Sequence, residues 1–148
     1  MPIKSFRGLM TDADIDIISL HTNDGSIGYR IVKFRLMGYE PGADNYEGIV
    51  KIYKISQSSA TPQIDFSDNT MLAAGFYTGN TTEATMKWDT AIFDNEVFNQ
   101  DIYITYNDLQ GSDAKMNYYI ELEQVKLTPD QNTVATLKDI RNIEEQYF

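Results

Sequence analysis

Residues 30–37 read Arg30-Ile31-Val32-Lys33-Phe34-Arg35-Leu36-Met37, in which apolar and charged side chains alternate. Side chains of a β-strand point alternately to opposite faces of the sheet, so this period of two predicts a strand with one buried face. We expect Val32, Phe34 and Leu36 to face the core, while Lys33 and Arg35 face the solvent. The segment predicts a sheet protein.

The same alternation returns at residues 101–106 and 116–123. Past residue 123 the apolar character moves from even to odd positions, at Val125 and Leu127. A change of face within a strand predicts a β-bulge, here near Glu123-Gln124. The expected inner faces consist of Ile102, Ile104 and Tyr106 in the first segment, and of Met116, Tyr118, Ile120 and Leu122 in the second.

Residues 48–55 are apolar on both faces, which predicts a strand that is covered on both sides. Weaker strand candidates lie at 15–20, 71–77, 86–88 and 91–98, and segments rich in Gly, Asn, Asp and Pro separate them. Short strands divided by such turns indicate an antiparallel sandwich or barrel. We expect one mainly β domain over residues 1–148, an antiparallel β-sandwich of the jelly-roll kind.

The C-terminal segment has a different pattern. Thr128 is a candidate N-cap, Pro129 suits the first helical position, and Gln131 follows the cap at the third position. Apolar residues then recur at 134, 137, 140 and 143. The sequence predicts one C-terminal α-helix over 129–146.

Composition excludes several classes of protein. The chain of 148 residues has no cysteine, so it forms no disulfide, thiolate metal site or iron–sulfur cluster. A net charge of −10 opposes binding to nucleic acid. No apolar run reaches the roughly 18 residues that a membrane-spanning helix needs, and no apolar segment follows the basic N-terminus. We therefore expect no membrane and no nucleic-acid partner, and synthesis inside a cell without a secretory signal.

The residues offer little to catalysis or metal binding. His21 is the only histidine, and the turn-forming sequence after it favours a surface position. The series Asp12, Asp14 and Asp16 has the spacing that begins a calcium loop, but Ile17 stands where that loop requires Gly. An exposed strand face explains these aspartates equally well, and a shared cation stays open. We expect no enzyme, no catalytic residue, no metal site and no cofactor.

Aromatic side chains beside predicted turns allow a second hypothesis. Acidic residues flank the tryptophan at Asp89, Asp94 and Glu96, as in a sugar-cleaving site, although acidic neighbours of a core aromatic give the same pattern. Exposed aromatic rings stack on sugars, so the chain could be a carbohydrate-binding or host-recognition module. The candidate stacking residues are Tyr39, Tyr46, Tyr77 and Trp88.

Four segments resemble small virion proteins of marine tailed bacteriophages: residues 20–34, residues 48–53, residues 92–104 and the closing stretch from Asn117 to Arg141. This resemblance covers over half of the chain. It implies a non-enzymatic structural protein of the virion, most simply a capsid decoration protein or a minor head or tail component. It implies no particular binding residue.

Such a protein acts by assembly, with other copies of itself, with the major capsid protein, or with both. We expect a homo-oligomer, since small β-domains on virions commonly associate. Apolar chain ends on an acidic domain need a partner surface, so we expect residues 1–10 to form an N-terminal arm. The candidate interface residues are Ile3, Phe6, Leu9, Met10, Tyr147 and Phe148.

Overall fold

The structure is a computed structural model, and it describes residues 2–22, 25–42, 45–80, 85–93, 96–111 and 114–130. All eight regular elements of these residues are strands. They are β1 (Ile3–Met10), β2 (Ile15–Ile18), β3 (Ile27–Gly38), β4 (Tyr46–Tyr53), β5 (Met71–Asn80), β6 (Thr85–Ile92), β7 (Ile102–Asp108) and β8 (Met116–Lys126).

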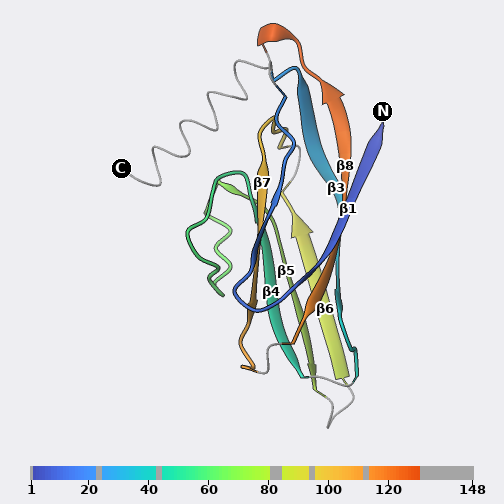
Figure 1. The fold of residues 1–148 in the computed structure, drawn as a ribbon, viewed down its shortest axis with the longest axis vertical. Coiled ribbons are helices and arrows are strands. Elements are labelled where there is room, and N and C mark those ends of the chain that lie inside the picture. The colour runs from blue at the N-terminus through green and yellow to red at the C-terminus, as the bar shows by residue number, and fades with distance from the viewer. Residues whose placement is uncertain are drawn as a thin grey trace.

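The strands form two antiparallel sheets that pack face to face, which confirms the predicted β-sandwich (Figure 1). The three-stranded sheet has the order β1-β8-β3, and the five-stranded sheet has the order β2-β7-β4-β5-β6. Strands that are neighbours in space, such as β3 and β8, are far apart in sequence. Much of the fold therefore depends on long-range pairing.

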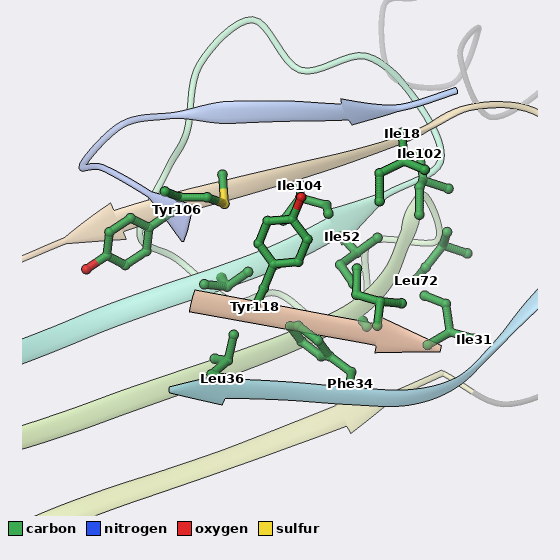
Figure 2. Packing of buried hydrophobic residues seen from close by; sticks show 14 of the residues in the cluster. Ile18, Ile31, Phe34, Leu36, Ile52, Leu72, Ile102, Ile104, Tyr106 and Tyr118 are labelled. Atoms are coloured by element: carbon green, nitrogen blue, oxygen red, sulfur yellow. The ribbon is translucent and has the colours of Figure 1, made fainter. Parts of the chain in front are cut away.

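One hydrophobic cluster fills the space between the sheets. Figure 2 shows Phe34 and Tyr118 of the three-stranded sheet facing Ile52 and Ile104 of the other sheet. The even positions of β8 and of β7 point inward, as their alternation predicted. Ile52, Ile104 and Ile120 are fully buried, so this cluster is the main apolar core of the described residues.

Strand β4 is buried on both faces, as predicted. Val50 and Ile52 face the other sheet, whereas Lys51 and Tyr53 lie beneath the connection between β4 and β5. This connection, residues 54–70, folds back over the outer face of the five-stranded sheet, and Figure 1 shows it in green beside β4 and β7. The connection thus forms a second, smaller layer over the five-stranded sheet.

Two details of the predicted strands are wrong. Val32 does not face the core: the β3–β8 register shifts between Ile31 and Lys33, which makes Val32 the extra residue of a bulge, and it is 42% exposed. No register shift occurs at Glu123-Gln124, where β8 stays paired with β3. The side chain of Gln124 points inward, where its amide nitrogen donates a hydrogen bond to the hydroxyl of Tyr29 at 3.4 Å.

The N-terminal segment is a strand where we expected an arm. Every residue of β1 from Ile3 to Met10 pairs with β8, and Met10 is fully buried. An extended apolar segment beside a sheet edge satisfies its backbone by joining that sheet, which explains the difference. The expected helix over 129–146 lies, beyond Asp130, outside the described residues.

Candidate binding surfaces

His21, which follows β2, and Asp101, which precedes β7, form a hydrogen-bonded pair. Asp101 Oδ1 accepts hydrogen bonds from the backbone amides of Leu20 at 2.9 Å and His21 at 3.1 Å, and it lies 2.6 Å from His21 Nδ1. Partial burial would raise the pKa of Asp101, but these hydrogen bonds and the charge of His21 outweigh it and lower that pKa. The pair anchors the chain beside β7.

The three aspartates near the β1–β2 turn do not converge. Asp12 Oδ1 accepts from the amide of Asp108 at 2.8 Å, Asp14 Oδ2 accepts from the amide of Thr11 at 2.9 Å, and Asp16 Oδ2 accepts from the Tyr118 hydroxyl at 3.1 Å. Among the described residues, no group of three or more acidic or histidine side chains could hold a metal ion. Each aspartate has a structural partner instead.

The described acids near Trp88 bond to different groups. Asp89 accepts from its neighbouring amide, that of Thr90, at 2.9 Å. Glu96 accepts a 2.6 Å hydrogen bond from the buried ammonium group of Lys54. Asp94, the third acid of the sugar-cleaving hypothesis, lies outside the described residues. Each of the two acids that are described has its own hydrogen-bond partner.

The structure divides the four candidate stacking residues into two pairs. Tyr46 and Tyr77 are buried in the core and contact each other edge to face, with ring centroids 5.2 Å apart, so neither can stack on a sugar. Tyr39 is 52% exposed, and Lys115 Nζ lies 5.3 Å from its ring centroid. Trp88 is 62% exposed and stacks on Tyr77 at 6.4 Å. Of these four candidates, only Tyr39 and Trp88 offer a ring to a ligand.

Trp88 lies in a groove between the edges of the two sheets. The groove has a volume of about 1000 Å³, and strands β3 and β6 form its walls. Thr90 bridges these strands, because its hydroxyl donates to the carbonyl oxygen of Phe34 at 3.1 Å. The groove is lined by apolar and basic groups that include Val32, Arg35, Met37, Pro41, Trp88 and Tyr119.

The outer face of the three-stranded sheet carries a row that we did not predict. Arg7 of β1, Tyr119 of β8 and Arg35 of β3 lie side by side in register, so their side chains share this face. Neither arginine forms an ion pair with another described residue, whereas Lys33 of the same face lies 3.7 Å from Glu121. Strand order is not readable from alternation, so no sequence signal brought these three residues together.

The candidate interface residues have different environments. Ile3 and Leu9 are 51% and 43% exposed on β1, and Phe6 packs partly against the core. Met10 is fully buried and unavailable to a partner. Tyr147 and Phe148 lie outside the described residues.

Over the residues placed in the structure, no helix is long and apolar enough to cross a membrane. Comparison with protein-family models, with curated proteins and with solved structures finds no match to this chain.

Proposed function

We propose that this protein is a non-enzymatic structural protein of a bacteriophage virion, most simply a capsid decoration protein, which acts by protein–protein assembly. The row of Arg7, Tyr119 and Arg35 on the outer face of the three-stranded sheet carries the proposal. Tyr and Arg are the residue types that recur in the energetic centres of protein interfaces. A sheet face with these groups suits another protein surface, and Arg35 and Tyr119 also line the groove beside it.

Charge supports the same function. The chain has a net charge of −10, yet Arg7 and Arg35 concentrate positive charge on one face. Such a local patch steers an acidic partner surface toward this face. The acidic remainder of the molecule would repel packaged nucleic acid, so the partners are other copies of this chain, the major capsid protein, or both.

We further propose that the sandwich is a jelly roll, the architecture common to many viral capsid and lectin domains. The orders β1-β8-β3 and β2-β7-β4-β5 are those that two nested Greek keys produce. Strand β6 departs from the pattern, because it pairs with β5. The hydrogen bond from Thr90 to the Phe34 carbonyl nevertheless holds β6 beside β3.

Quantitative mass spectrometry of purified particles tests the virion function. We expect the chain at a simple ratio to the major capsid protein, as a decoration protein requires, and a vertex or tail component would be present in only a few copies. Particles that lack the native protein should bind it when it is added back, and bind Arg35→Glu at least tenfold more weakly. Lys87→Glu, on the other sheet, is the matched control. Absence of the chain from purified native particles would contradict the proposal.

One observation favours a second function, a carbohydrate-binding or host-recognition module. The exposed ring of Trp88 is braced from behind by Tyr77, which is itself held by Tyr46, so the groove has a rigid aromatic platform. Binding on a glycan array that is lost in Trp88→Ala and kept in Phe76→Ala would establish this function. Phe76 is a suitable control, because it is exposed on β5 outside the groove.

A further inference from the structure

Strand β1 presents an unpaired backbone edge. The amide of Gln124 donates to the carbonyl oxygen of Pro2 at 2.9 Å, which makes position 2 a hydrogen-bonded partner of β8. Hydrogen-bonded positions alternate along an antiparallel strand. The backbone N–H and C=O groups of the odd positions, Ile3, Ser5, Arg7 and Leu9, therefore point away from β8.

No described strand pairs with this edge, because β1 is the terminal strand of its sheet. A cavity of about 500 Å³ separates Lys4, Ser5 and Phe6 from the segment that follows β2, at Ser19 to Thr22. The edge is thus accessible to another strand, and Figure 1 shows β1 on the outside of the molecule.

The sequence of β1 is complementary to itself. When two copies run antiparallel with Phe6 opposite Phe6, all four odd positions of one copy face odd positions of the other, so every outward N–H and C=O group finds a partner. The two exposed apolar side chains, Ile3 and Leu9, then contact each other across the interface, and the same register brings together Ser5 with Arg7 and Lys4 with Gly8.

Other registers are poorer. A shift that centres the pair on Arg7 places two arginines opposite each other, and like charges directly across strands are destabilising. A shift that centres it on Ser5 places Leu9 beyond the end of the partner's β1 and Ile3 opposite Arg7. Charged residues on an edge strand commonly prevent pairing, and here Arg7 prevents only the wrong register.

We propose that two copies of this chain associate through β1, antiparallel and centred on Phe6, so that their three-stranded sheets become one continuous sheet. This inference names the first partner and the surface of the assembly function proposed above, and rests on that function. The rows of Arg7, Tyr119 and Arg35 from both copies would then lie on one extended face, which doubles the basic surface offered to an acidic partner.

Engineered cysteines test the register, since the natural chain has none. Opposed residues in hydrogen-bonded pairs have Cα atoms about 5.5 Å apart, within the roughly 4.4–6.8 Å that a disulfide spans. We expect an equimolar mixture of Ile3→Cys and a tagged Leu9→Cys to form mainly the mixed disulfide under a redox buffer. Each variant alone should form little disulfide-linked dimer. Equal linking of Ile3→Cys to itself, or no mixed product, would overturn the register.

Ser5→Pro tests the pairing itself. Proline removes an N–H group that points outward from an edge strand, so the β1–β8 ladder stays intact. We expect sedimentation equilibrium to show a dimer for the native chain and for Ser5→Ala, and a dissociation constant at least tenfold weaker for Ser5→Pro. A monomeric native chain, or a Ser5→Pro dimer of native affinity, would overturn the proposal.

The two proposals fail separately. If the chain is abundant on particles but monomeric in solution, and Ser5→Pro does not change its binding to particles, the β1 dimer is wrong and the virion function stands. If the mixed disulfide forms but particles contain no copies of the chain, the virion function is wrong and the β1 dimer stands.

Discussion

The hydroxyl of Tyr118 on β8 donates a 3.1 Å hydrogen bond to Asp16 Oδ2 on β2, and so joins the side chains of the two sheets. The tyrosine ring lies over Gly8, where a Cβ atom would come within 2.8 Å of the ring. Burial, followed by the charge of Asp16 and its hydrogen bond, raises the pKa of Tyr118 well above its ordinary value. Tyr118 is therefore a neutral donor at every physiological pH.

Tyr118→Phe should lower the free energy of unfolding. The substitution removes a hydrogen bond to a charged acceptor, a class that contributes about 1.5–3 kcal/mol. Because Asp16 is only half-buried, we expect a loss of about 1.5 kcal/mol in urea unfolding at pH 7. Tyr119→Phe, on the outer face of the same strand, is the control and should change stability by less than about 0.5 kcal/mol. Equal losses in both variants would contradict this role of the hydrogen bond.

Alkaline pH should weaken the fold through two buried tyrosines. Burial and the charge of Asp68 raise the pKa of Tyr53 to about 12, and the pKa of Tyr118 is raised as well, from an ordinary value of 10.0 in each case. The folded state therefore keeps protons that the unfolded chain has lost. This stability is fully present below pH 10 and is lost as pH rises from there toward the folded-state pKa values.

Unfolding experiments between pH 10 and pH 12 measure this effect. Each tyrosine contributes a slope of up to about 1.4 kcal/mol per pH unit. We expect Tyr118→Phe to reduce the slope by about that amount relative to the native chain. Lys51 contributes a slope of opposite sign, because burial lowers its pKa although the charge of Asp68 acts to raise it. Both proteins contain Lys51, so its contribution cancels in the comparison. Identical slopes for the two proteins would show that Tyr118 is not the responsible group.

Lys51 should hold the connection 54–70 against the five-stranded sheet. Its buried ammonium group donates to Thr61 Oγ1 at 2.9 Å and to the carbonyl oxygen of Gln63 at 2.7 Å. Lys51→Ala removes both bonds, so amide hydrogen exchange over residues 60–66 should become about 10- to 100-fold faster. Lys87→Ala on β6 is the control and should leave that exchange unchanged. Unaltered protection in Lys51→Ala would show that apolar packing alone holds the connection.

The sequence predicts what depends on local pattern. Alternation identified the inward positions of β7 and β8, and the apolar character of both faces correctly predicted that β4 is covered twice. The prediction that Val32 faces the core was wrong, because a bulge changes which face the side chains of a strand point to. No local pattern in the sequence marks this bulge. The C-terminal helix and the virion function stay predictions.

The candidate site was less predictable, because burial of an aromatic ring depends on distant partners. Tyr46 follows a turn-rich segment and looked exposed. In the structure its ring packs over Gly38, and its hydroxyl accepts from the amide of Glu40 at 2.9 Å. Tyr77 is covered by Trp88 of the next strand. The row of Arg7, Tyr119 and Arg35 likewise exists only through the order β1-β8-β3.

Gly38→Ala should therefore destabilise the fold through Tyr46. A Cβ atom on Gly38 would lie 2.7 Å from Tyr46 Cζ, which is too close for any side chain to accept without movement. Overpacking of this kind costs about 1–3 kcal/mol, and we expect a loss in that range from denaturant unfolding. In a Tyr46→Ala background the ring is absent, so adding Gly38→Ala should cost less than about 0.5 kcal/mol. If the two substitutions are instead additive, the effect belongs to the backbone of β3 and not to the contact with Tyr46.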